Sequence, residues 1–304
     1  MAFATAHSTM PDEAEMEVVF RPAGAAGGLA CWLALPGRMA VDQAPLVAVH
    51  GIRRNARQQA ELLARRASAL GRPVIAPLFD RETWPRYQQA VRRGRADLAL
   101  IALMKALKKE GVRQTTRFEL AGFSGGAQFA HRFAMMHPEM VTRLTVASAG
   151  WYTFPDAARF PYGLSCRNAP PDPWSAVTDD TIGRFLTIPV QVCVGADDTL
   201  RDAGLRSGET IDAQQGANRL IRGIRWTKAL RQATQARGLP PRASFIALSA
   251  CGHDFRQCVL RGGLDRIIFP DNDRKSPVIG GCGRDCSACD RPCKAGMRLL
   301  RPMP

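Results

Sequence analysis

The sequence predicts an α/β fold in which a mostly parallel central sheet is covered by helices on both faces. Short apolar runs, many of them rich in β-branched residues, alternate along the chain with longer segments of helical periodicity. This alternation is typical of parallel strands joined by crossover helices. A length of 304 residues suffices for one such domain with a large core and would leave two full domains cramped.

The predicted elements follow from this alternation. Glu17–Phe20 and Leu29–Leu35 are expected to form an opening antiparallel pair. Six further strands are expected at Leu46–Val49, Pro73–Pro77, Phe118–Gly122, Arg143–Ser148, Ile188–Val194 and Ala243–Leu248. The helices are expected over Ala56–Leu70, Tyr87–Glu110, Gly126–His137 and Gln215–Arg237.

The most informative motif is Gly122-Phe123-Ser124-Gly125-Gly126, which lies between a predicted strand and a predicted helix. In this context Gly-x-Ser-x-Gly is typical of a nucleophile elbow, a strained turn that exposes a serine hydroxyl to a base and a substrate. Small residues beside the serine let the strand and the helix approach closely. Ser124 is therefore the candidate nucleophile.

Candidate partners follow later strands. The strand ending at Val194 leads into Gly195-Ala196-Asp197-Asp198, and the strand ending at Leu248 leads to His253. Ser, then acid, then His, with each residue after a strand, fits a Ser-His-Asp triad. Elimination among the five histidines leaves His253 as the base. Asp198 is the preferred acid and adjacent Asp197 the alternative, whereas Asp202 and Asp254 are interpreted as surface charges.

A candidate oxyanion hole follows the strand Leu46–Val49. That strand ends in His50-Gly51-Ile52, a His-Gly turn of the kind that supplies one backbone N–H to a developing anion, while the second N–H comes from the residue after the nucleophile. We expect Ile52 and Gly125 to be the two donors, with Gly51 as the alternative to Ile52. His50 is interpreted as a structural loop residue.

With these motifs, the chain from about Val18 to about Leu260 resembles the serine hydrolases of the α/β-hydrolase fold. The His50-Gly51 turn and the stretch Gly122–Phe129 are similar to the esterase and polyhydroxyalkanoate-depolymerase-like branch. The resemblance implies an enzyme that cleaves a small-molecule or polymeric ester without a cofactor. A thioesterase, an amidase or peptidase, and a polyester depolymerase use the same residues, and a non-catalytic binding protein of this fold is a further alternative.

The resemblance also suggests the domain organisation. Residues 1–15 are interpreted as a flexible leader, 16–268 as the catalytic domain with a short cap insertion at about 151–186, and 269–304 as a tail. The cap segment is rich in aromatic residues and proline. Trp151 and Tyr152 are candidates for one wall of a substrate pocket and Phe79 for the other. The alternative is that these aromatic side chains pack against one another or their own loops.

The tail contains four closely spaced cysteines in the pattern C-x3-C-x2-C-x3-C: Cys282, Cys286, Cys289 and Cys293. A structural zinc site is the leading interpretation, because four thiolates suit tetrahedral Zn²⁺. Disulfides, which need an oxidising compartment, an iron–sulfur cluster and free thiols are the alternatives.

The chain carries a formal net charge of +15. The basic residues are mostly arginine and are spread along the whole sequence, so nucleic acid is not expected to be the partner, although attraction of an anionic substrate or membrane surface stays open. The first residues do not resemble a signal peptide, and no apolar run is long enough to span a membrane. A cytoplasmic location is therefore expected, and the odd total of nine cysteines fits a reducing compartment.

Overall fold

The computed structural model describes residues 16–24, 28–37, 40, 43–92, 94–166 and 172–270. In this part of the chain, eight strands form one sheet in the order β1-β2-β4-β3-β5-β6-β7-β8. The strands are β1 (Val18–Arg21), β2 (Ala30–Ala34), β3 (Leu46–Val49), β4 (Val74–Leu78), β5 (Phe118–Phe123), β6 (Val141–Ala147), β7 (Val190–Gly195) and β8 (Ala243–Leu248).

Strand directions agree with the sequence prediction. β1 pairs antiparallel with β2, and β2 pairs antiparallel with β4. All other neighbours are parallel. All four residues of β3, at the centre of the sheet, are buried, as expected for a parallel strand that is covered on both faces. The predicted mostly parallel sheet is therefore confirmed.

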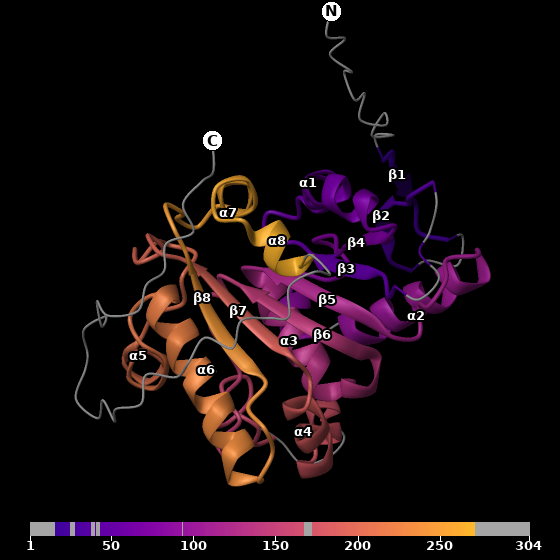
Figure 1. Ribbon diagram of the computed structural model, residues 1–304. Coiled ribbons are helices and arrows are strands. Elements are labelled where there is room, and N and C mark those ends of the chain that lie inside the picture. Colours follow the sequence, from indigo (N-terminus) through magenta and orange to yellow (C-terminus); the bar gives the residue numbers. More distant parts are fainter. Residues whose placement is uncertain are drawn as a thin grey trace, which may run out of the picture.

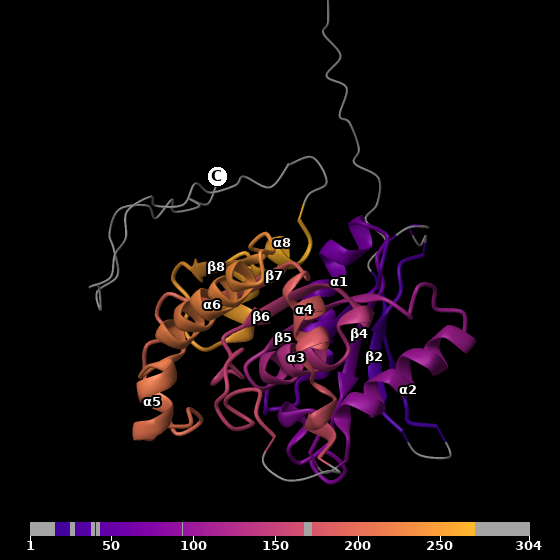
Figure 2. The ribbon, with the colours of Figure 1, turned by 90° about the horizontal axis from the view of Figure 1, so that it is seen from below.

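Helices cover both faces of the sheet. The α-helices are α1 (Ala56–Ala69), α2 (Ala96–Lys109), α3 (Gly125–Met136), α4 (Asp179–Leu186), α5 (Glu209–Gln215), α6 (Arg219–Ala236), α7 (Phe255–Leu260) and α8 (Leu264–Ile268), with 3-10 turns η1 (Tyr87–Gln89), η2 (Pro138–Met140) and η3 (Pro173–Ala176). One buried cluster joins the sheet to α1, α7 and α8, and a larger one joins it to α2, α3, α4 and α6. Figures 1 and 2 show these two groups of helices on opposite sides of the strands.

The helix predicted over Tyr87–Glu110 is wrong in its first part, because α2 begins only at Ala96. Positive φ angles at Ala90 (54°), Gly94 (93°) and Arg95 (45°) interrupt the helical path. A Cβ atom at Gly94 would lie 2.7 Å from the carbonyl oxygen of Thr83, so only glycine fits this close approach. Residues 79–92 and 94–95 therefore belong to a loop after β4 that contains the short turn η1, and not to one long helix.

The helix predicted over Gln215–Arg237 is also divided. Gly216 has a φ of 105° and ends α5, and Asn218 then caps α6, its side chain accepting a hydrogen bond from the Ile221 amide at 3.0 Å. The break matters for the site because it places Arg219 at the first position of α6.

The segment between β6 and β7 contains η3 and α4. Phe160 and Trp174 lie 4.4 Å apart between ring centroids, and both are fully buried. These two side chains thus form part of the core, which agrees with the alternative that aromatic residues of the predicted cap segment pack together.

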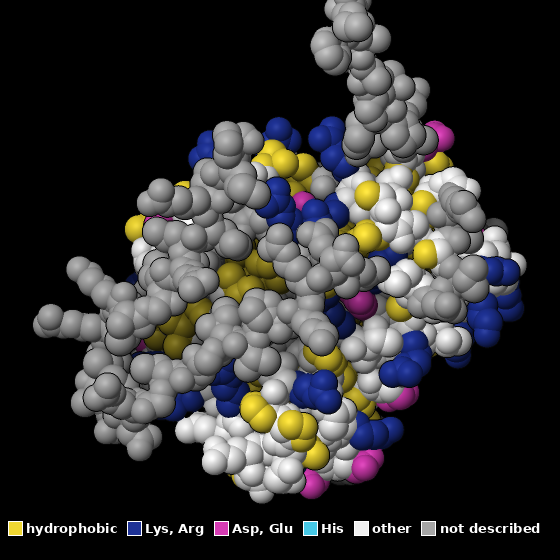
Figure 3. All heavy atoms as spheres, viewed as in Figure 1, with side chains coloured by type: hydrophobic (Ala, Val, Ile, Leu, Met, Phe, Trp, Pro, Cys, Tyr) yellow, Lys and Arg dark blue, Asp and Glu magenta, His cyan; other side chains and the backbone are white. Residues whose placement is uncertain are grey.

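Positive charge is distributed widely over the surface. Figure 3 shows Lys and Arg side chains over several elements of one face, without a single continuous stripe. Among the described residues, no helix combines the length and the apolar character that crossing a bilayer requires.

Candidate active site

Ser124 lies at a sharp turn between β5 and α3, with φ 55° and ψ −113°. Such angles are strained for a residue with a side chain and occur where the surrounding packing holds them. Glycines on both sides allow this packing: a Cβ atom at Gly122 would lie 2.3 Å from the Gly126 carbonyl oxygen, and one at Gly126 would lie 2.0 Å from the Val49 carbonyl oxygen. The strand and the helix therefore approach closely enough to project the partly exposed Ser124 from the carboxyl edge of the sheet.

The structure brings Ser124, His253 and Asp198 together. Nε2 of His253 lies 2.9 Å from Oγ of Ser124, and Nδ1 lies 2.8 Å from Oδ2 of Asp198. When Nδ1 carries the proton and donates a hydrogen bond to the carboxylate, Nε2 of the neutral ring is unprotonated and can accept the proton of the serine hydroxyl. The neighbouring carboxylate of Asp197 is exposed and makes no contact with His253 among those recorded for the described residues.

Two loops hold Asp198 and His253 in place. A Cβ atom at Gly195 would lie 2.2 Å from the Cys251 carbonyl oxygen, so the loop after β7 and the loop after β8 pack backbone against backbone. The imidazole of His253 also stacks on Phe123, with 5.2 Å between ring centroids. Asp254 caps α7 by accepting a hydrogen bond from the Gln257 amide at 2.8 Å, which fixes the chain directly after His253.

Sequence reasoning missed Arg219. Its Nη1 lies 3.3 Å from Oδ1 of Asp198 and 2.7 Å from Oδ2 of Asp202. Asp202, interpreted from the sequence as a surface charge, is thus a partner of a buried arginine. The position of Arg219 depends on the chain break before α6, which the helical periodicity of the sequence did not indicate.

The two predicted oxyanion donors are neighbours in space. A Cβ atom at Gly125 would lie 3.3 Å from the Ile52 backbone nitrogen, and a Cβ atom at Gly51 would lie 3.4 Å from Cβ of Ser124. Gly125 is the first residue of α3, so its N–H has no acceptor within the helix. The Ile52 N–H also has no recorded acceptor in the described part of the chain. Both amides are therefore available beside Ser124.

His50 supports this turn from behind. Its Nδ1 donates to the Gly51 carbonyl oxygen at 2.8 Å, and its Nε2 accepts a hydrogen bond from the Phe79 amide at 3.0 Å. Burial lowers the pKa of His50 to about 4, so the ring is neutral near pH 7. The Tyr87 hydroxyl donates to the His50 carbonyl oxygen at 2.6 Å. His50 is thus a structural residue of the loop.

The three aromatic pocket candidates are all buried. Tyr152 is fully buried and stacks on Trp226 at 4.7 Å between ring centroids. Phe79 is fully buried and stacks on Tyr87 at 5.0 Å. The structure therefore places both in the core, and their assignment to a substrate wall is corrected. Trp151 is 6% exposed and lies under two guanidinium groups, those of Arg132 and Arg206.

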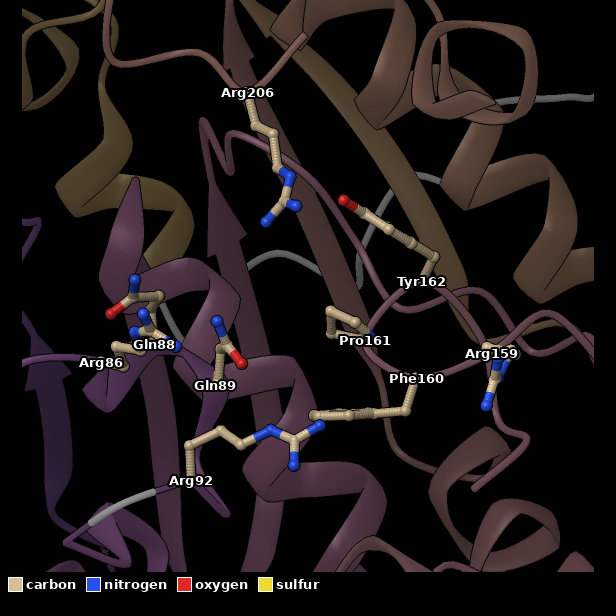
Figure 4. A pocket seen from close by; sticks show the side chains of 9 residues that line it. All are labelled: Arg86, Gln88, Gln89, Arg92, Arg159, Phe160, Pro161, Tyr162 and Arg206. Atoms are coloured by element: carbon tan, nitrogen blue, oxygen red, sulfur yellow. The ribbon is translucent and has the colours of Figure 1, made fainter. Parts of the chain in front are cut away.

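A cavity of about 950 Å³ opens between three segments of the chain. Figure 4 shows that its walls come from the loop after β4, from the segment between β6 and β7, and from Arg206. The lining residues are Arg86, Gln88, Gln89, Arg92, Arg159, Phe160, Pro161, Tyr162 and Arg206. Sequence reasoning missed this set because the helix predicted over Tyr87–Glu110 included Arg92, which in the structure precedes α2.

The predicted metal site lies outside the described residues, as do all four of its cysteines, Cys282, Cys286, Cys289 and Cys293. In the described part of the chain, no group of His, Cys, Asp and Glu side chains is arranged to hold a metal ion. The described cysteines are free thiols: Cys31, Cys166, Cys193, Cys251 and Cys258.

No protein-family model and no curated protein matches the chain. Among solved structures, it is similar to poly(aspartic acid) hydrolase-1 from Sphingomonas sp. KT-1, at 22% sequence identity and a TM-score of 0.67, with 79% of this chain and 93% of that chain covered. It is similar to the poly(3-hydroxybutyrate) depolymerase LpqC from Bordetella parapertussis at 24% identity and a TM-score of 0.67, covering 80% and 86%. Est1E from Butyrivibrio proteoclasticus shares 13% identity at a TM-score of 0.50, covering 83% and 97%. At these identities the likeness shows the fold, and the α/β-hydrolase fold predicted from the sequence is confirmed.

Proposed function

We propose that the chain is a serine hydrolase that cleaves carboxylic esters through an acyl-enzyme. The observation that carries this proposal is the pair of contacts made by His253, 2.9 Å to Oγ of Ser124 and 2.8 Å to Oδ2 of Asp198. A nucleophile, a base and an acid within hydrogen-bond distance are what activation of a serine hydroxyl requires.

In the first step, Oγ of Ser124 bonds to the carbonyl carbon of the ester while its proton moves to Nε2 of His253. The carbonyl electron pair moves onto oxygen, where the amides of Ile52 and Gly125 donate to it. Each such donor is worth about 10²–10³ in turnover. Asp198 holds the imidazole in the correct tautomer and stabilises the imidazolium.

The tetrahedral intermediate then collapses. The bond to the alcohol oxygen breaks, the leaving alkoxide takes the proton from Nε2, and an acyl-enzyme on Ser124 remains. Water attacks the acyl carbon and gives a proton to Nε2. The second collapse breaks the bond to Oγ, which recovers that proton, and the carboxylic acid leaves.

A depolymerase for polymeric esters is the second candidate. The cavity of about 950 Å³ lies at the upper end of the range for small-molecule sites, so it has room for several units of a chain. Two proteins of the same fold are named as hydrolases of polymers, one of poly(aspartic acid) and one of poly(3-hydroxybutyrate). Thioesters and amides are compatible with the same three side chains.

Ser124→Ala tests the mechanism. We expect the variant to lose hydrolysis of short p-nitrophenyl esters and labelling by a fluorophosphonate, and to keep the thermal unfolding temperature of the wild type. Ser68→Ala, on α1, is the matched control and keeps both activities. Ester turnover retained by Ser124→Ala would contradict the proposal. A panel of esters, thioesters and amides on the wild type then ranks the substrate classes.

A further inference from the structure

The charged residues that line the cavity are all arginines. They are Arg86, Arg92, Arg159 and Arg206, and none of the nine described lining residues is acidic. Figure 4 shows the guanidinium groups on different sides of the cavity, with Arg206 facing Tyr162 from one side and Arg92 reaching toward Phe160 from another. The cavity is therefore surrounded by positive charge.

The cavity walls begin beside the elbow. Tyr87, between the lining residues Arg86 and Gln88, has its hydroxyl 2.9 Å from the position of a Cβ atom on Gly125. On the other side, Arg206 follows Leu205, whose Cδ1 lies 4.0 Å from the position of a Cβ atom on Gly150. Gly150 lies three residues after Ala147, the last residue of β6, and the Ala147 carbonyl oxygen accepts a hydrogen bond from the Ser124 amide at 2.8 Å. The cavity and the nucleophile thus share the carboxyl edge of the sheet.

Two of the arginines are held by aromatic rings. The Arg206 guanidinium lies 5.4 Å from the Tyr162 ring centroid and 5.7 Å from that of Trp151, and the Arg92 guanidinium lies 4.9 Å from that of Phe160. In the described part of the chain, the side chains of Arg86, Arg92 and Arg206 make no recorded hydrogen bond or ion pair. A ring contact orients a guanidinium and leaves its N–H groups available.

A fifth arginine adds charge beneath the cavity. Arg132 is fully buried, donates to the carbonyl oxygen of the lining residue Gln88 at 2.7 Å, and packs 4.2 Å from the Trp151 ring centroid. Its Nη2 has no hydrogen-bond partner, and no carboxylate pairs with it among the described residues. A buried cation without a counter-ion is costly, and an anion bound in the cavity would offset that cost.

We propose that this cavity is a substrate subsite for carboxylate groups, so that the enzyme prefers esters whose chain carries several negative charges. The proposal rests on the proposed function, because it places the anionic part of the substrate beside the ester bond cleaved at Ser124. A guanidinium binds a carboxylate through two parallel N–H donors. Charges spread around a wide cavity fit several carboxylates along one chain better than they fit a single compact anion.

Two readouts test the subsite. The first compares kcat/KM for p-nitrophenyl hydrogen adipate, which is anionic, with that for its neutral methyl ester. We expect the wild type to favour the anionic ester, and the preference to shrink about tenfold in the Arg86→Gln, Arg206→Gln double variant, since a charge-assisted hydrogen bond contributes more than a neutral one. Arg113→Gln, which changes an exposed arginine outside the cavity lining, is the control and keeps the preference.

The second readout does not depend on turnover. Calorimetry with Ser124→Ala protein measures binding of tricarballylate, a tricarboxylate, and of inorganic phosphate. We expect tricarballylate to bind more tightly, and the two Arg→Gln changes to remove that binding. Binding of phosphate alone, or an equal loss of activity on both esters in the double variant, would overturn the carboxylate subsite. Failure of the proposed function is distinguishable from failure of the subsite, because it would appear as ester turnover that is retained in Ser124→Ala.

Discussion

Arg219 contacts the oxygen of Asp198 that His253 leaves free. Its Nη1 lies 3.3 Å from Oδ1, while Nδ1 of His253 lies 2.8 Å from Oδ2. The side chains of Arg219 and Asp198 are 3% and 2% exposed. Asp202 completes the arrangement by pairing with the same guanidinium at 2.7 Å. One buried cation therefore fixes the carboxylate that orients the proposed base.

Arg219 is accordingly a positioning residue, and its removal should lower turnover more than it weakens substrate binding. We expect Arg219→Met to reduce kcat by about 10²-fold, because a displacement of about 1 Å in a catalytic group has costs of that order, with KM little changed. Arg219→Lys should recover part of the loss, since it keeps the charge but not the planar donors. Steady-state kinetics on p-nitrophenyl acetate checks both.

The control for Arg219 is Lys228→Met, which removes an exposed cation from the same helix and should keep wild-type kcat. Thermal unfolding separates a local effect from a global one, because Arg219→Met leaves two carboxylates without their cation and should also lower stability. An Arg219→Met protein that is less stable but has wild-type kcat would show that the contact is structural only.

Gly125→Ala tests the oxyanion hole. A methyl group at this position would lie 2.8 Å from Cγ2 of Ile52 and 2.9 Å from the Tyr87 hydroxyl, so the two proposed donors must move apart. We expect kcat to fall by about 10²-fold, the typical value of one donor. Ile52→Ala alone should have a small effect, because the Ile52 side chain is half exposed and its backbone N–H is retained. Combined with Gly125→Ala, it should restore part of the activity.

The cysteine pattern of the tail predicts metal binding that is independent of ester cleavage. If the four thiolates hold zinc, purified protein carries about one zinc per chain. Cys286→Ser with Cys289→Ser should lose that zinc and keep wild-type kcat, because the proposed ester mechanism uses no metal. Elemental analysis and ester kinetics on both proteins check this. Metal-free, reduced wild-type protein would contradict the zinc site.

The sequence predicted those features whose causes are local. Gly122 is required by its close approach to Gly126, two residues beyond Ser124, and the order of Ser124, Asp198 and His253 along the chain follows the order of the strands β5, β7 and β8. The arginines of the cavity could not be predicted in this way. Arg92 lies on a loop because Gly94 packs against Thr83, and such a close approach leaves no periodic signal.

The sequence likewise did not indicate whether an aromatic side chain points into the core or toward a pocket. Tyr152 follows β6 and is adjacent in sequence to Trp151, yet its ring packs on Trp226 of α6, while Trp151 lies under Arg132. Which of two neighbouring rings enters the core depends on the helices that cover the sheet, and that packing is a property of the whole fold.

The stability of the protein should decrease on acidification through the histidines that are buried as neutral rings. His50 and His131 each accept a hydrogen bond from a backbone amide at 3.0 Å through Nε2, those of Phe79 and Thr153 respectively. Burial lowers the pKa of His50 from 6.5 to about 4, and burial also lowers the pKa of His131 well below 6.5. Protonation of Nε2 would break the hydrogen bond that each ring accepts. On acidification the two histidines are therefore protonated in the unfolded state before they are protonated in the folded state.

Because the folded-state pKa values lie below the unfolded value, the free energy of unfolding should be at its full value above pH 6.5 and should fall as the pH drops toward 4. His50 alone contributes about 3 kcal/mol over this interval, at about 1.4 kcal/mol per pKa unit. Urea unfolding at pH 7.5, 6.5, 5.5 and 4.5 measures the decrease, and His50→Gln should show a visibly smaller one.

Above pH 4 the carboxylate of Asp97 does not interfere: burial raises its pKa, but the hydrogen bonds from Arg95 and His137 outweigh burial and bring the value to about 2. An unfolding free energy that stays constant from pH 7.5 to 4.5 would show that the two rings can be protonated in the folded protein without loss of their contacts.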